Sequence, residues 1–115
     1  MKKKSIVDHI AILVEDLKVA EEWYCSKIDC KVTYRDKKYV RLKTESTNIA
    51  LIHKDFYQHA HFAILVDKKE DLPTESGQTV KHRDGTIGVY VKDPFGNYLE
   101  YIWYSEKSKE VFLSE

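Results

Sequence analysis

Apolar residues along the chain follow a pattern that occurs twice. Residues 7–14 (VDHIAILV) and residues 61–66 (HFAILV) are rich in β-branched and aliphatic side chains, and each stretch predicts a buried strand. Residues 15–29 (EDLKVAEEWYCSKID) carry apolar residues at helical spacing after Asp16, which can cap a helix. A strand followed by an amphipathic helix is therefore predicted at the start of the chain.

The predicted helix implies where several of its side chains lie. Trp23 and Tyr24 fall on the face that should pack against the sheet, so both are expected in the core. Asp29 stands where the helix should end, and Asp tolerates the left-handed conformation that often ends one. Cys25 and Cys30 are five residues apart, a spacing that places them on different sides of a helix.

Three further strands are predicted after the helix, and three more after the second copy of the opening strand. Polar turns, including Asp84-Gly85 and residues 93–97 (DPFGN), separate them. Pro73 interrupts the short segment that follows the second opening strand, so its helix is expected to be short or absent. The predicted strands are KVTYRD, YVRLKTE and NIALIHK in the first half, and TVKHRD, TIGVYVKD and NYLEYIWY in the second.

The chain is therefore predicted to be an α+β protein made of two βαβββ modules, with a repeat offset of 52 residues (61 − 9). A sheet of this length cannot bury its own face, so two of them are expected to form a curved, half-open mixed β-barrel. The predicted organisation is a single domain over residues 1–115, with module one at residues 5–54, module two at residues 58–105 and a tail at residues 106–115 that contains the least ordered residues.

Each opening strand begins with a histidine, and the repeat places His9 and His61 in equivalent positions. In the last predicted strand, alternation puts Glu100 on the same face as Tyr98 and Ile102. A carboxylate in an apolar strand is costly to bury unless it is paired or binds a metal. Two imidazoles and one carboxylate form a metal-binding set that leaves coordination positions open.

Simpler interpretations of the same residues remain open. A single buried histidine is more often a satisfied core residue than a metal ligand, and Glu100 is a surface residue if the strand faces the other way. His53 and His59 are most simply loop residues. Metal binding is favoured when the three residues are taken together, because the repeat places His9 and His61 in equivalent positions.

Composition and charge limit the partners. The chain has 115 residues, and Lys+Arg and Asp+Glu number 19 each, so no overall field attracts nucleic acid. The opening MKKK is followed by no apolar segment of signal-peptide or membrane-spanning length, so no membrane partner is expected. With no secretory signal and no C-x-x-C pair, reduced thiols and a cytoplasmic location are expected.

The chain resembles the vicinal oxygen chelate superfamily, which includes glyoxalase I, bleomycin-resistance proteins, extradiol dioxygenases and fosfomycin-resistance enzymes. The resemblance rests on three stretches that together span nearly the whole sequence: DHIAILVEDLKVAEEWYCSKI, AHFAILVD and GVYVKDPFGNYLEYIW. It implies two βαβββ modules, a homodimer and a divalent metal chelated by two neighbouring oxygens of a small-molecule substrate. His9, His61 and Glu100 match the metal ligands of the superfamily.

Positions at which the chain differs from the family pattern reduce the number of reaction classes that are expected. Glyoxalase I has a fourth protein ligand at the end of the first module, and the offset between Asn97 and Asn48 assigns that position to Leu51, which cannot ligate. Glyoxalase I chemistry is therefore disfavoured. In fosfomycin-type thiol transferases a hydroxyl residue stands two places after the first histidine, where this chain has Ala11.

Two classes with three ligands remain open. Tyr90 matches the family tyrosine before the Pro-x-Gly turn in both, and Lys81 suits an anion-binding position of the thiol transferases. His82 lies near the histidine that extradiol dioxygenases use for proton transfer. Tyr90, His82 and Lys81 are thus the candidate catalytic residues, although a core role for Tyr90 and a solvated strand edge for the other two are the simpler interpretations.

The predicted function is a small divalent-metal-dependent enzyme with extradiol dioxygenase-like or fosfomycin-type chemistry. Mn or Fe is favoured as the metal, with Zn or Ni as alternatives. The competing hypothesis is a metal-free protein that binds and sequesters a small molecule such as a drug. That hypothesis predicts that the metal ligands are lost, whereas all three candidates are present.

Overall fold

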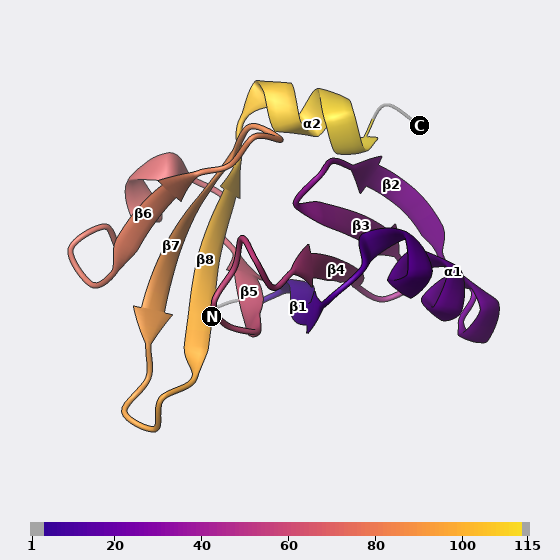
Figure 1. Cartoon of the computed structure of the whole chain (residues 1–115). Helices are drawn as coiled ribbons and strands as arrows, with labels where there is room; N and C mark the ends of the chain where they lie inside the picture. Colours follow the sequence, from indigo (N-terminus) through magenta and orange to yellow (C-terminus); the bar gives the residue numbers. More distant parts are fainter. Residues whose placement is uncertain (1–3, 114–115) are drawn as a thin grey trace. The chain divides into compact units, whose positions relative to one another are not determined.

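The computed structural model describes residues 4–113, with side chains described as far as residue 110. Met1 to Lys3, which begin the predicted basic start MKKK, lie outside the described residues. The chain divides into two compact units: an N-terminal unit, His9–His61, and a C-terminal unit formed by the residues up to Asp8 together with the chain from Phe62 onward (Figure 1).

The N-terminal unit contains four strands in the order β2-β3-β4-β1. β1 pairs in parallel with β4, so that His9 is opposite Asn48 and Ala11 is opposite Ala50. β3 pairs antiparallel with both β2 and β4. The strands are β1 (Val7–Val14), β2 (Lys31–Arg35), β3 (Tyr39–Lys43) and β4 (Asn48–His53), all as predicted from the alternation of apolar residues.

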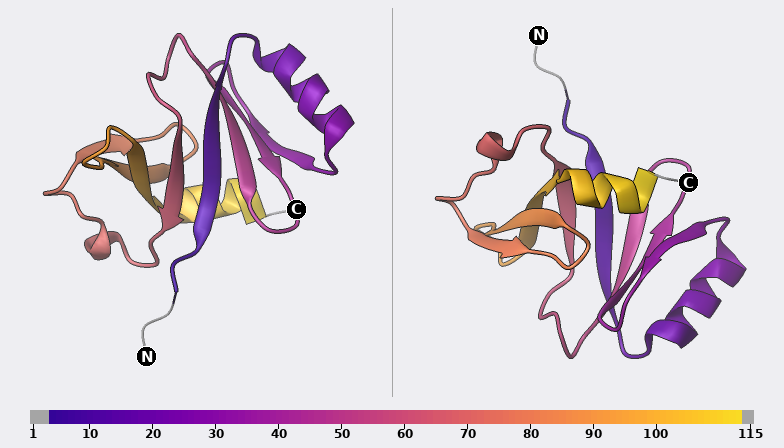
Figure 2. Two further views of the ribbon diagram at one scale, coloured as in Figure 1. Left: turned by 90° about the horizontal axis from the view of Figure 1, so that it is seen from below. Right: turned by 90° about the horizontal axis from the view of Figure 1, so that it is seen from above.

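Helix α1 (Leu17–Lys27) connects β1 to β2 and lies against one face of these strands (Figure 2). The carboxylate of Asp16 accepts a hydrogen bond from the backbone N–H of Val19 at 3.0 Å, so the predicted N-cap is confirmed. Tyr24 packs on the core beneath the helix, but Trp23 is 54% exposed and its predicted core position is wrong. The helix ends at an extended Ile28, and no described non-glycine residue has a positive φ, so the predicted left-handed Asp29 is also wrong.

The two faces of this sheet carry different apolar clusters. Val40, Leu42 and Leu51 form the cluster under α1. The opposite face carries a second cluster, built from Ala11, Tyr39, Ala50 and Ile52 with Tyr34 and Tyr57 packed against it. The parallel pairing of β1 and β4 places His9 on this second face, because its side chain alternates in phase with that of Ala11.

The C-terminal unit contains strands in the order β5-β8-β7-β6. The second module has one turn of 3₁₀-helix, η1 (Lys69–Asp71), where the first module has α1. The prediction that this helix is short or absent is therefore confirmed. Gly85 and Gly96 have φ values of 94° and 92°, which glycine adopts without steric cost in the two predicted turns. The strands are β5 (His61–Leu65), β6 (Gln78–Lys81), β7 (Thr86–Lys92) and β8 (Tyr98–Tyr104).

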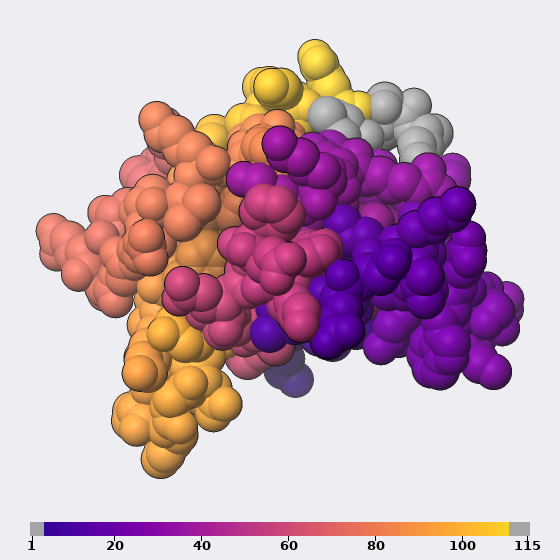
Figure 3. All heavy atoms as spheres, viewed as in Figure 1, coloured from indigo at the N-terminus to yellow at the C-terminus, as the bar shows by residue number. Residues whose placement is uncertain are grey.

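The β7–β8 hairpin is closed by a carboxylate. Asp93 Oδ1 accepts hydrogen bonds from the backbone N–H groups of Phe95 at 2.7 Å and Asn97 at 2.8 Å. These bonds hold the pKa of Asp93 below its usual range, with the bond from Asn97 as the largest cause. The tip of the hairpin protrudes from the molecular surface in Figure 3, and Phe95 is 86% exposed there.

A second helix, α2 (Glu106–Leu113), occupies the predicted tail, whose last two residues lie outside the described part of the chain. Ser105 caps it by accepting a hydrogen bond from the backbone N–H of Ser108 at 3.2 Å, and the Ser105 hydroxyl donates to the carbonyl of Gly85 at 2.7 Å. This helix was not predicted from the sequence, which indicated only that the least ordered residues lie in this segment. Among the described residues, no helix combines the length and the apolar character needed to cross a membrane.

The α+β class and the order of two βαβββ modules with a reduced second helix are confirmed by these two units.

Candidate metal centre

The first two predicted ligands lie next to each other in the N-terminal unit. His9 is on β1 and His61 is the first residue of β5; they are 6% and 8% exposed. Their ring centroids are 5.7 Å apart, with the rings in an edge-to-face arrangement. The centre of an imidazole ring lies about 3 Å from a metal that it ligates, so two rings at this separation can share one ion.

A third histidine joins this pair, and sequence analysis had assigned it only to a loop. The His59 ring centroid lies 5.6 Å from that of His61, again edge to face. His59 does lie in the loop before β5, as predicted, but no strand alternation applies there, so the sequence carried no signal for its proximity. His53, the other predicted loop histidine, is the last residue of β4 and accepts a hydrogen bond from the backbone N–H of Asp55.

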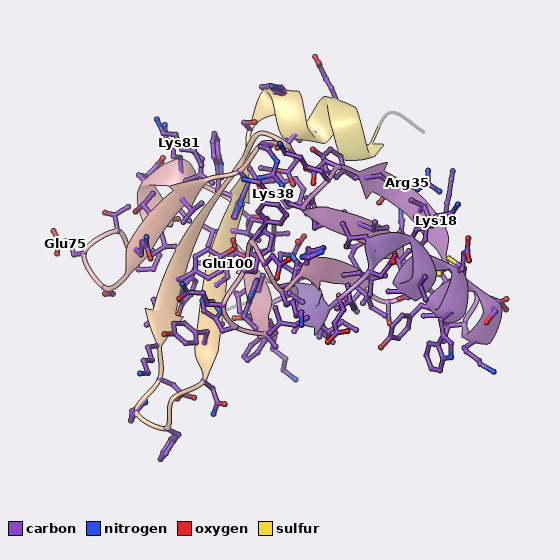
Figure 4. All side chains as sticks on the ribbon, viewed as in Figure 1. Lys18, Arg35, Lys38, Glu75, Lys81 and Glu100 are labelled. Atoms are coloured by element: carbon purple, nitrogen blue, oxygen red, sulfur yellow. The ribbon has the colours of Figure 1, made fainter. Side chains whose placement is uncertain are left out.

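The third predicted ligand, Glu100, lies in the middle of β8 in the C-terminal unit and is labelled in Figure 4. Its exposure is 1%, and Ile102 on the same face of the strand is 3% exposed, so the predicted inward face is confirmed. A carboxylate buried to this extent is destabilising unless polar partners or a cation compensate for its lost hydration.

His82 supplies one partner to Glu100. Nε2 of His82 lies 2.9 Å from Oε2 of Glu100, with the imidazole N–H as donor when the carboxylate is ionised. Tyr90 is directly opposite Glu100 in the β7–β8 pairing, and its hydroxyl oxygen lies 3.4 Å from the same Nε2. The structure therefore brings together two of the three predicted catalytic residues, His82 and Tyr90, around one predicted ligand.

The third predicted catalytic residue has no such contact. Lys81 is the last residue of β6, and it is exposed (Figure 4). Its neighbour His82 has a side chain that is only 14% exposed, so the two adjacent residues differ sharply in environment. An anion-binding role for Lys81 stays a prediction.

Gly88 makes room for the carboxylate of Glu100. A Cβ atom at position 88 would lie 2.0 Å from Oε2 of Glu100 and 3.0 Å from Nε2 of His82. A side chain at position 88 would force Glu100 to move, so the glycine keeps open the space that the two polar groups occupy. Sequence analysis missed this role, although a glycine within the strand TIGVYVK is a recognised sign that another group approaches closely.

Leu51, the predicted counterpart of a fourth ligand, faces away from His9. Leu51 is fully buried in the cluster beneath α1, on the face opposite His9, so it is not the position to compare with a ligand. The residue on the correct face is Ala50, which pairs with Ala11. Because alanine also offers no ligand atom, the absence of a fourth carboxylate at this point of β4 is unchanged. The prediction of Leu51 was wrong because the position was counted from Asn48 and Asn97, whereas the pairing of the strands decides which face a residue occupies.

Comparison with solved structures identifies the fold. The chain is similar to methylmalonyl-CoA epimerase from Mycobacterium tuberculosis, with a TM-score of 0.72 and 17% identity over 93% of this chain and 95% of the epimerase. It is also similar to a hypothetical protein from Bacillus halodurans C-125, with a TM-score of 0.69 and 18% identity over 90% and 97% of the two chains.

A glyoxalase/bleomycin resistance protein/dioxygenase superfamily member from Vibrio splendidus 12B01 matches with a TM-score of 0.60 and 13% identity, over 87% of this chain and 99% of that one. No protein-family model and no curated protein sequence matches the chain. The chain thus has the fold of the vicinal oxygen chelate superfamily, as the sequence motifs predicted.

Proposed function

We propose that this chain is a small divalent-metal-dependent enzyme in which His9, His61 and Glu100 together hold one metal ion. The observation that carries the proposal is the burial of all three side chains, each of which offers one ligand atom. Two imidazoles and one carboxylate suit Mn(II), Fe(II), Ni(II) or Zn(II) and leave coordination positions for other ligands. When bound, the metal supplies Lewis acidity and a template for two neighbouring substrate oxygens.

The chain's own residues prepare Glu100 for this role. The bond from His82 occupies Oε2 and leaves Oε1 to ligate, which favours a single fixed orientation of the carboxylate. Partners of this kind commonly fix the orientation and basicity of a metal ligand. We therefore assign to His82 the positioning of Glu100; the hydroxyl oxygen of Tyr90 lies near the same Nε2.

Substrate access is favoured by small residues. Ala11 and Ala50 are paired on the face of β1 and β4 that carries His9, and neither side chain fills much space beside that histidine. We propose that a small molecule with two adjacent oxygens binds there. Tyr90 and His82 are the candidates for proton transfer to or from such a substrate.

The reaction is tested with protein reconstituted separately with each of the four metals. Oxygen consumption with catechols is expected if the chemistry is of the extradiol dioxygenase type, and consumption of a thiol with fosfomycin if it is of the transferase type. The His61→Ala variant serves as the inactive control. Protein that binds metal but catalyses neither reaction contradicts the proposed chemistry, and protein that binds no metal favours the metal-free sequestering function.

A further inference from the structure

Two cysteines of the N-terminal unit lie side by side. The sulfur atoms of Cys25 and Cys30 are 3.6 Å apart, near the end of α1. Sequence analysis had placed them on different sides of a helix, which is wrong because α1 ends at Lys27 and the chain then turns back toward β2. Cys25 is exposed and Cys30 half-buried, and neither forms a disulfide in this structure.

We propose that Cys25 and Cys30 form an oxidisable dithiol, a modification site that hydroperoxides convert to an intramolecular disulfide. Two sulfur atoms at 3.6 Å are in van der Waals contact, whereas a disulfide bond is about 2 Å long. The two sulfur atoms must therefore approach each other by about 1.6 Å for the bond to form. Cys30 lies in the connection between α1 and β2, where no regular hydrogen-bond pattern fixes the backbone, so the chain can adjust at this position.

The environment distinguishes the two thiols. Glu21, which is hydrogen-bonded to Arg35, holds the pKa of Arg35 above its usual range, and Cys25 makes a smaller contribution in the same direction. Burial, followed by the neighbouring Cys25, raises the pKa of Cys30 to about 11. The exposed sulfur of Cys25 is the one that meets an oxidant first, and the half-buried sulfur of Cys30 is positioned to react second.

The chemistry balances with the peroxide as the only co-reactant. The Cys25 sulfur, as the thiolate, attacks one peroxide oxygen; an S–O bond forms, the O–O bond breaks, and the departing oxygen is protonated and leaves as water from hydrogen peroxide or as an alcohol from an organic hydroperoxide. The Cys25 sulfur is oxidised by two electrons and the peroxide is reduced. The Cys30 sulfur then attacks the sulfur of the Cys25 sulfenic acid; the S–S bond forms, the S–O bond breaks, and the hydroxyl group leaves as water with the proton of the Cys30 thiol.

This site is separate from the proposed metal centre. α1 packs on the cluster of Val40, Leu42 and Leu51, whereas His9 lies on the opposite face of the same strands. Oxidation of the pair is therefore expected to leave metal content unchanged. The proposal stands or falls independently of the enzymatic function.

The test is treatment of the reduced full-length protein with limiting hydrogen peroxide, followed by iodoacetamide and intact-mass analysis. The wild-type protein is expected to lose both alkylatable thiols and the mass of two hydrogen atoms, to stay monomeric on a non-reducing gel, and to recover both thiols with dithiothreitol. The Cys30→Ser variant is expected to stop at a sulfenic acid that dimedone traps, and Cys25→Ser to react about tenfold more slowly.

Three results would overturn the proposal. The first is wild-type protein that accumulates sulfinic acid at Cys25 while Cys30 stays alkylatable. The second is oxidation that yields disulfide-linked dimers rather than an internal bond. The third is a Cys30→Ser variant that gives the same product distribution as the wild type, since the second thiol would then play no part.

Discussion

Nε2 of His82, in the turn between β6 and β7, lies 2.9 Å from Oε2 of Glu100, the buried carboxylate of β8. If this contact positions Glu100 as a metal ligand, His82→Ala should weaken metal binding by about 10- to 100-fold. Isothermal titration of the metal-free protein with Mn(II) or Zn(II) measures the effect.

Two variants control for this change. Lys81→Ala, at the exposed neighbouring position, should bind metal as the wild type does. His82→Gln retains an N–H donor and should recover part of the lost affinity. Equal affinities in His82→Ala and wild type would show that the contact has no positioning role.

Gly88→Ala should disturb the same carboxylate by steric exclusion. The added methyl would occupy the space of Oε2 of Glu100, so Glu100 must move, at a cost of about 1–3 kcal/mol in the free energy of unfolding. Metal affinity should fall together with stability. Chemical denaturation and metal titration of the same variant measure the two effects.

The matched control for Gly88→Ala is Val89→Ala, at the fully buried next position of β7, whose side chain points to the other face. That change should cost about 1–3 kcal/mol and leave metal affinity unchanged. If both variants lose affinity equally, general destabilisation rather than displacement of Glu100 is responsible.

The N-cap of α1 is expected to stabilise the N-terminal unit. Asp16→Ala removes the acceptor for the N–H of Val19 and should lower the free energy of unfolding by about 1 kcal/mol. Asp16→Asn keeps an oxygen acceptor and should be close to wild type. Urea denaturation followed by circular dichroism compares the three proteins, and an Asn variant as unstable as the Ala variant would contradict the capping role.

One surface ion pair should make stability depend on pH. Arg35 Nε lies 2.7 Å from Oε1 of Glu21, and this hydrogen bond lowers the pKa of Glu21. A carboxyl whose pKa is lower in the folded state stabilises the protein above its unfolded pKa, and this contribution is lost as pH falls through the folded pKa. Glu21→Gln should therefore melt at a lower temperature than wild type at pH 7.

That difference in melting temperature should shrink as the pH is lowered to about 3. It should also shrink in high salt, since both side chains contact solvent. A difference that is constant from neutral to acidic pH would show that Glu21 acts through packing and not through its charge.

Much of the fold followed from local sequence signals. Strand alternation predicted the inward face of β8, including Glu100, because side chains in a strand alternate regardless of context. Asp16 was predictable as a cap because its hydrogen bond is made within one helical turn. The repeated histidine placed His9 and His61 as a pair, since both stand at the same position of a duplicated sequence stretch.

What the sequence did not predict depends on contacts between distant segments or on the path of an irregular one. The role of Gly88 depends on side chains from β8 and from the turn before β7. Leu51 was misassigned because strand register, not the distance from a turn, decides which face a residue occupies. The contact between Cys25 and Cys30 depends on the direction in which the chain leaves α1, which helical periodicity cannot give.

Metal content tests the central proposal most directly. Purified protein, stripped of metal and reloaded with excess Mn(II) or Fe(II), should retain about one ion per chain on elemental analysis after dialysis. His9→Ala, His61→Ala and Glu100→Gln should each lose it while keeping the wild-type circular dichroism spectrum. Wild-type protein that never holds metal above background, or folded variants that all retain it, would contradict the proposal that these three side chains bind one ion.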